Sequence, residues 1–150
     1  MQPGMENLKS RAQSHSPLLI STEGNRQASV AMILRNLESV PQMFFIERAR
    51  NENDPWSGQI AFPGGNRDDS DDDAIATARR ETYEEVGIQL PPDSMIGRLN
   101  DQQGRNNYHS LNLVISCFVF ELQECHETLD NYEVADSFWI DIAHLSDLEN

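Results

Sequence analysis

Three glutamates stand close together near the middle of the chain, in the segment Arg80-Glu81-Thr82-Tyr83-Glu84-Glu85. At about 100° of helical rotation per residue, Glu81 and Glu85 lie one turn apart and point the same way. Arg80 is the i,i+4 neighbour of Glu84 and can hold that carboxylate in place. The spacing therefore predicts a carboxylate cluster with its own arginine brace.

Carboxylates crowded at the margin of an apolar helix face repel one another and lose hydration, which costs stability without a cation. Mg²⁺ takes oxygen ligands and usually binds through a few carboxylates together with substrate phosphates. We therefore predict that Glu81 and Glu85 hold Mg²⁺ or Mn²⁺, joined by Glu84 and the backbone carbonyl of Gly64, because glycine allows close backbone approach. The alternative is a solvated, glutamate-rich helix end.

The glutamates belong to a loop followed by a helix, within Phe62–Ile88. A Pro-Gly-Gly turn precedes an acidic loop, and Ser70 with Asp73 three residues later has the spacing of a capping box. Gly87 fits a C-terminal stop. Glu81 and Glu85 lie on the margin of one side of the predicted helix. That side carries Ala74, Ile75, Ala78, Thr82 and Val86.

Other segments have the composition of strands. Ala28–Leu34 and Met43–Ile46 predict paired strands joined by the polar stretch Arg35–Gln42, and Leu111–Leu122 predicts a strand buried on both faces, the centre of the sheet. Shorter strands are expected at Gln59–Phe62, Met95–Leu99 and the end of Glu133–Ile140. We expect a polar loop at Asn100–Tyr108 and the first turns of a helix at Ala143–Leu148. Met5–Ala12 could form a short helix, although its helical pattern is weak.

Composition limits the class of protein. The chain has 150 residues, of which 38% are hydrophobic and 24% charged, as in an ordinary globular domain. Its formal net charge of −14 argues against nucleic-acid or membrane partners and leaves a phosphorylated small molecule as the expected one. No membrane-spanning run or signal peptide is apparent, so the expected location is the cytoplasm. Cys117 and Cys125 are expected to be free thiols.

The central segment resembles the Nudix hydrolase signature, G-x5-E-x7-R-E-U-x-E-E-x-G-U, in which U is aliphatic. Arg80–Ile88 matches its second half, with Thr82 at an aliphatic position. In the first half, counting back from Arg80 places the pattern's Glu on Asp72, and Gly65 is then one residue too far away. The chain thus carries one extra residue and an Asp for a Glu, with Asp71 as the alternative occupant.

The residues before this segment narrow the resemblance. The run Trp56–Gly65 (WSGQIAFPGG) is similar to the G-Q-[IV]-x-F-P-G-G motif of coenzyme A pyrophosphatase-type members, and Thr77-Ala78-x-Arg80-Glu81 fits the same subgroup. Some members have a His before the Gly-Gln pair, where this chain has Asp54-Pro55-Trp56. The resemblance implies metal-dependent hydrolysis of a diphosphate bond, with coenzyme A or acyl-CoA as the leading substrate.

The resemblance also implies residue roles. Glu84, or Glu133 before the last strand, would take the proton of the attacking water, with Arg80 completing the catalytic set. Arg48, Gln59 and Phe62 would contact substrate, although Arg48 is also interpretable as a surface arginine. ADP-ribose-like compounds and noncanonical nucleotides are the alternative substrates, and a non-catalytic nucleotide-sensing module is the alternative class.

The implied fold is α+β, an α/β/α sandwich: a mixed β-sheet with a catalytic loop and helix and a short or missing C-terminal helix. We divide the chain into an N-terminal arm at residues 1–17 and a single domain at residues 18–150. A homodimer is left open.

Overall fold

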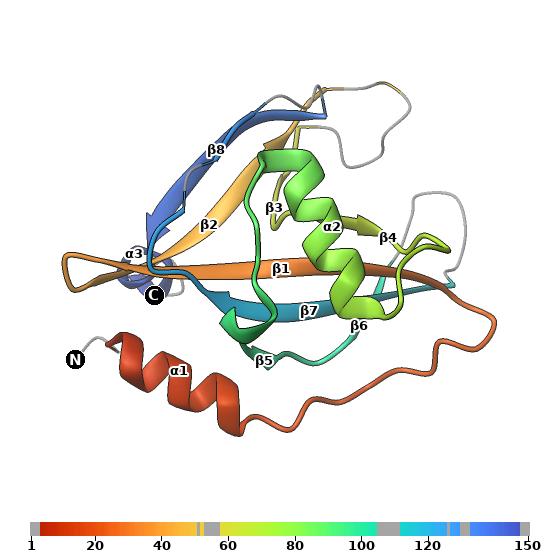
Figure 1. Cartoon of the computed structure of the whole chain (residues 1–150), viewed down its shortest axis with the longest axis horizontal. Coiled ribbons are helices and arrows are strands. Elements are labelled where there is room, and N and C mark those ends of the chain that lie inside the picture. The colour runs from red at the N-terminus through yellow and green to blue at the C-terminus, as the bar shows by residue number, and fades with distance from the viewer. Residues whose placement is uncertain are drawn as a thin grey trace.

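A mixed sheet forms the middle layer of the molecule (Figure 1). The computed structural model describes residues 4–50, 52, 58–104, 112–125, 127–129 and 133–147. Within them, α2 (Ala74–Val86) packs on one face of the sheet, while α1 (Met5–Ser14) and α3 (Ile142–Asp147) contribute to a second apolar cluster on the other face. The predicted mixed sheet and three-layer α+β arrangement are confirmed.

Two long parallel strands lie at the centre of the sheet. β1 (Arg26–Leu37) and β7 (Leu113–Glu121) pair from Arg26 opposite Leu113 to Leu34 opposite Glu121. The hydrogen-bonded order is β3-β2-β1-β7-β5, with β4 beside β1, β6 beside β7 and β8 beside β2. These other strands all pair antiparallel; their bounds are β2 (Val40–Arg48), β3 (Ile60–Ala61), β4 (Gly64–Asn66), β5 (Met95–Arg98), β6 (Gln102–Gly104) and β8 (Val134–Asp141).

The predicted central strand is β7, none of whose residues is exposed. Its side chains alternate between two apolar clusters. Phe118 and Phe120 belong to the cluster under α2, whereas Val119 belongs to the cluster with Met5 of α1. The nearly continuous apolar sequence of β7 therefore reflects helices on both faces of the sheet.

Two predicted connections were wrong. The stretch Arg35–Gln42 is mostly strand, because pairing of β1 with β2 continues to Leu37 opposite Val40. Only Glu38 and Ser39 remain for the turn, both with positive φ (49° and 69°), as in a two-residue type I′ hairpin. The predicted loop Asn100–Tyr108 likewise contains a strand, β6, and its residues after Gly104 lie outside the described part of the chain.

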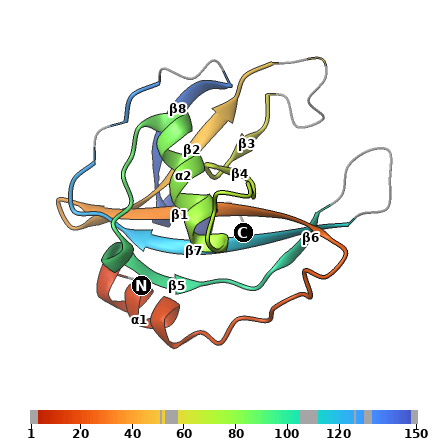
Figure 2. The same cartoon turned by 45° about the vertical axis from the view of Figure 1, so that its right-hand side comes forward.

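The predicted N-terminal arm at residues 1–17 contains α1, a full helix that lies along β5 (Figure 2). Met5 is buried, and Ala12 packs against Gly97, where a side chain would collide with the helix backbone. Lys9 forms an ion pair with Glu121 at 3.3 Å. The helical pattern of this segment is weak, so the sequence did not predict that it packs against the sheet. None of the helices in the described residues is long and apolar enough to cross a membrane.

Thr82 lies on the buried face of α2, at the position that is aliphatic in the Nudix signature, and is 0% exposed. Its Oγ1 has no hydrogen-bond partner in the described structure. Thr82→Val keeps the shape and removes a hydroxyl that pays its desolvation without compensation. We expect the variant to gain about 1 kcal/mol in unfolding free energy and about 2–4 °C in melting temperature. A lower melting temperature in calorimetry would contradict this prediction.

Candidate functional site

The carboxylate-bearing helix α2 begins at a cap that differs from the predicted one. Asp73 is the N-cap, and its side chain accepts a hydrogen bond from the backbone N–H of Ala76 at 2.8 Å. Ser70 instead donates to Asp68 within the preceding loop. The capping box predicted at Ser70 is therefore wrong, whereas Gly87, with φ of 71° and its N–H bonded to Tyr83, ends the helix as predicted.

Arg80 is the centre of the polar network on this helix. Its Nε donates to Asp71 Oδ1 at 2.9 Å, and its Nη2 donates to Asp71 Oδ2 and to the carbonyl of Asn66, each at 3.0 Å. Its Nη1 donates to Glu81 at 3.0 Å and to Glu84 at 3.2 Å. Every nitrogen of the guanidinium is engaged, so the brace predicted between Arg80 and Glu84 also holds Glu81 and the preceding loop.

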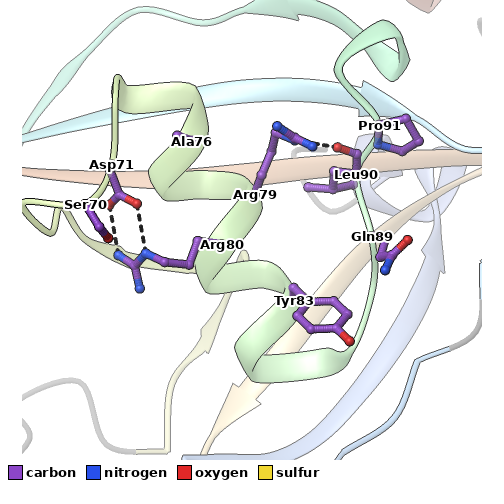
Figure 3. Close-up of a pocket in the computed structure, with 9 residues that line it drawn as sticks. All are labelled: Ser70, Asp71, Ala76, Arg79, Arg80, Tyr83, Gln89, Leu90 and Pro91. Atoms are coloured by element: carbon purple, nitrogen blue, oxygen red, sulfur yellow. Dashed lines mark hydrogen bonds and ion pairs between the residues drawn. The ribbon is translucent and has the colours of Figure 1, made fainter.

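Asp71, rather than Asp72, is the loop carboxylate that pairs with Arg80 (Figure 3). Asp71 is buried and also accepts hydrogen bonds from the N–H of Asp68 and the hydroxyl of Thr77, whereas Asp72 is exposed. The hydrogen bonds from Arg80 hold the pKa of Asp71 well below its usual range. Counting forward from Gly65 by the signature spacing leads directly to Asp71, so the extra residue lies between Asp71 and Arg80.

Glu85 is buried more deeply than predicted, since the sequence placed it on the margin of the apolar helix face. It is 2% exposed, and its Oε1 accepts a hydrogen bond from the N–H of Gly64 in β4 at 2.8 Å. Gly65 is in contact with the other carboxylate, because a Cβ on this residue would lie 2.5 Å from Cδ of Glu81. The Gly-Gly strand thus forms a cradle for Glu81 and Glu85 that any side chain at position 65 would fill.

Burial changes the ionisation of both glutamates. It raises the pKa of Glu85 to about 7 and also raises the pKa of Glu81. The negative charge of Glu133 acts in the same direction on both groups, whereas Arg48 favours the ionised form of Glu85. Two partly dehydrated carboxylates therefore repel each other, and the nearby cations that favour their ionised forms are Arg80 for Glu81 and Arg48 for Glu85.

The other predicted site residues come from the neighbouring end of the sheet. Arg48 ends β2 opposite Val134 of β8, its N–H bonds to the carbonyl of Gln59, and the carbonyl of Glu133 accepts from Ala49. The Gln59 residue is exposed. Phe62 stacks on Phe45 with ring centroids 5.2 Å apart. Asp54–Ser57 lie outside the described residues.

A separate hollow of about 630 Å³ lies on the outer side of α2, between that helix and the segment Gln89–Pro91 (Figure 3). Arg79, whose Nε donates to the carbonyl of Leu90 at 2.6 Å, and Tyr83 line it together with Arg80 and Asp71. The three glutamates are absent from its lining. This hollow is therefore distinct from the carboxylate cradle, although Arg80, which lines it, also bonds Glu81 and Glu84.

The donors of the cradle fit a hard divalent cation. They are carboxylate oxygens beside glycine backbone, the ligand chemistry that Mg²⁺ and Mn²⁺ prefer, and a cation would relieve the dehydration of Glu81 and Glu85. In the described residues no three His, Cys, Asp or Glu side chains converge as a ready-made ligand set, because Glu81 and Glu84 face Arg80 while Glu85 faces Gly64. Cys117 and Cys125 are free thiols, as predicted, and burial raises the pKa of each to about 11.

Comparison with known proteins decides the family. The NUDIX domain model matches residues 25–150. The chain belongs to the Nudix family. An uncharacterized protein of Schizosaccharomyces pombe is 35% identical over 140 residues, covering 80% of this chain and 43% of that protein. The mitochondrial coenzyme A diphosphatase NUDT8 of Mus musculus is 30% identical over 123 residues, covering 82% of this chain and 58% of that protein.

The Nudix chain spans about half the length of these curated relatives. Among solved structures, the NUDIX domain of Shewanella oneidensis NrtR complexed with ADP ribose superposes with a TM-score of 0.64 at 17% identity. The match covers 89% of this chain and 78% of that one and shows a shared fold. The family and the Nudix hydrolase relatives support a hydrolase, and such enzymes generally use divalent metals such as Mg²⁺ or Mn²⁺.

The raised pKa of Glu85 predicts how metal-free stability varies with pH. Folding raises this pKa from 4.5 to about 7, so the protonated carboxyl is favoured in the folded state. Its contribution to stability is present below pH 4.5 and is lost as the pH rises to about 7. Glu85→Gln keeps the shape without the charge and should exceed the wild type by about 1–3 kcal/mol in unfolding free energy at pH 8, but not at pH 4.

Urea unfolding in EDTA at both pH values measures this difference. Glu84→Gln is the matched control, because it makes the same change at an exposed glutamate of the same helix and should not reproduce the gain of Glu85→Gln at pH 8. Identical pH dependence of stability in wild type and Glu85→Gln would contradict the prediction.

Proposed function

We propose that the chain hydrolyses the diphosphate bond of a nucleoside diphosphate linked to another moiety, and that coenzyme A or acyl-CoA is this substrate. The observation that carries the proposal is the pair of dehydrated carboxylates, Glu81 and Glu85, packed against the Gly64-Gly65 backbone. Such a pair is destabilising unless a cation binds it, and diphosphate chemistry needs that cation.

Glu81 and Glu85 would hold Mg²⁺ or Mn²⁺, joined by Glu84 and the carbonyl of Gly64. When bound, the ion supplies charge neutralisation for the bridging phosphates and lowers the pKa of a water molecule. Arg80 keeps the carboxylates of Glu81 and Glu84 in fixed positions through its Nη1. The protein side chains would therefore orient the metal ligands and accept one proton.

The proton acceptor would be Glu84 or Glu133. Glu84 is exposed beside Arg80, and Glu133 is near enough to Glu81 and Glu85 for its charge to raise the pKa of both. Arg48, at the same end of the sheet, would neutralise phosphate charge of the substrate. Gln59 and Phe62 would contact the rest of it, Phe62 as part of an aromatic stack with Phe45.

The choice of coenzyme A rests on two similarities. One is the run Gly58–Gly65, which is similar to the motif of coenzyme A pyrophosphatase-type members. The other is the 30% identity to a coenzyme A diphosphatase over 82% of this chain. ADP-ribose, bound by the structural neighbour from Shewanella oneidensis, is the rival that an experiment has to separate.

The test is a competition between coenzyme A, ADP-ribose and 8-oxo-dGTP at equal concentration, with Mg²⁺ or Mn²⁺ and mass-spectrometric detection. We expect coenzyme A to be consumed first, giving 4′-phosphopantetheine and 3′,5′-ADP without free orthophosphate. In ¹⁸O-water only one of the two products should carry the label, since one phosphorus is attacked.

Glu85→Gln is the control for this assay and should abolish turnover while the protein stays folded, because it removes a ligand charge at nearly constant shape. Faster consumption of ADP-ribose or 8-oxo-dGTP would replace the substrate and keep the diphosphate chemistry. Absence of metal-dependent turnover of all three, or near-full activity of Glu85→Gln at saturating metal, would contradict the proposed site.

A further inference from the structure

Thr77 is a buried polar residue of α2 whose hydroxyl donates a hydrogen bond to the Asp71 carboxylate. The residue is 0% exposed, and its Oγ1 donates to Asp71 Oδ2 at 2.8 Å. The weaker approach of the same atom to the carbonyl of Asp73 is 3.5 Å. The hydroxyl proton therefore points at the loop carboxylate rather than back along the helix.

Asp71 links Thr77 to the metal-binding glutamates. Its two oxygens accept from Nε and Nη2 of Arg80 at 2.9 and 3.0 Å, and the remaining Nη1 of the same guanidinium donates to Glu81 and Glu84. Since a guanidinium is planar and rigid, the plane of the Asp71 carboxylate sets the direction in which Nη1 points. Any rotation of that carboxylate is passed on to both glutamates.

The carboxylate needs this extra restraint because it stands on an unusual loop. The chain has one residue more than the Nudix signature between Asp71 and Arg80, and an Asp where the signature has a Glu. The terminal torsion of an Asp side chain is broad, so its plane depends on the partners of both oxygens. Besides the arginine fork, Oδ2 accepts hydrogen bonds from the backbone N–H of Asp68 at 2.9 Å and from the hydroxyl of Thr77 at 2.8 Å, and Thr77 is the one of these two that comes from the helix. A Thr in a helix has two favoured rotamers, and in the one seen here the hydroxyl of Thr77 reaches Oδ2 of Asp71.

We propose that Thr77 is a positioning residue of the metal site: its hydroxyl fixes the plane of the Asp71 carboxylate, and Asp71 then orients Arg80 toward Glu81 and Glu84. The proposal rests on the proposed function only in taking these glutamates as ligands. Thr77 itself touches neither substrate nor metal and acts through Asp71.

The first test measures Mn²⁺ affinity by the EPR signal of free Mn²⁺, using the full chain at pH 8. Thr77→Val, which replaces the hydroxyl by a methyl of similar size, should weaken binding by up to roughly tenfold, the lower end of the loss seen when a direct partner of a ligand is removed, because Thr77 acts on the ligands through Asp71 and Arg80. Thr77→Ser keeps the hydroxyl and should bind as the wild type does. Thr82→Val is the matched control, because it makes the same change at a buried Thr of the same helix whose hydroxyl has no partner in the described structure.

The second test needs no metal. In the wild type the Nε–H of Arg80, held by Asp71, should give a slowly exchanging ¹⁵N NMR signal, and Thr77→Val should speed its exchange with water while Thr77→Ser and Thr82→Val do not. In an Asp71→Asn background Thr77→Val should add little, because the residue that transmits its effect is already altered. Thr77→Ala, which places no second methyl beside the carboxylate, repeats both tests if Thr77→Val fails to fold.

The outcomes separate the two ideas. A wild type that binds no Mn²⁺ would overturn the metal site of the proposed function, and the Arg80 signal would still decide the role of Thr77. Unchanged Mn²⁺ affinity together with an unchanged Arg80 signal in Thr77→Val would overturn the role of Thr77. Failure of Thr77→Ser to restore both, or a full effect of Thr77→Val in the Asp71→Asn background, would do the same.

Discussion

The site depends on one guanidinium shared between a loop and a helix. Arg80 holds Asp71 with two of its nitrogens and the glutamates of its own helix with the third. The pairing is partly buried, so its hydrogen bonds are worth more than those of an exposed ion pair, and loss of Arg80 would leave the buried Asp71 carboxylate without its counter-charge. The loop and the carboxylate cluster are therefore fixed together.

The scaffold supplies the rest of the geometry through backbone. β4 pairs with β1 from Ala28 opposite Asn66 to Val30 opposite Gly64, which holds the Gly-Gly strand in the sheet where it contacts α2. Gly64 has no room for a side chain on the β1 side, and Gly65 has none on the side of Glu81. Burial of Glu85 against this strand costs stability in the absence of a cation, which is the usual cost of a preorganised site.

The sequence predicted the parts of the site that follow from local periodicity, namely the helix, its Gly87 end and the pairing of Arg80 with Glu84. It did not predict how deeply Glu85 is buried, because this burial depends on the contact of β4 with the helix and not on the helix itself. For the position of the signature's Glu, the sequence favoured Asp72 and gave Asp71 only as the alternative, because a count back from Arg80 assumes the usual spacing. The hairpin at Glu38-Ser39 was missed because polar residues near its end suggested a longer connection.

The most direct test of the account is the location of the metal in crystals grown with Mn²⁺, measured from anomalous scattering. The account predicts a peak at the carboxylates of Glu81 and Glu85 beside the Gly64 backbone, with Arg80 still paired to Asp71. A peak elsewhere on the molecule, or none at this place in crystals of an enzyme that requires Mn²⁺, would contradict it.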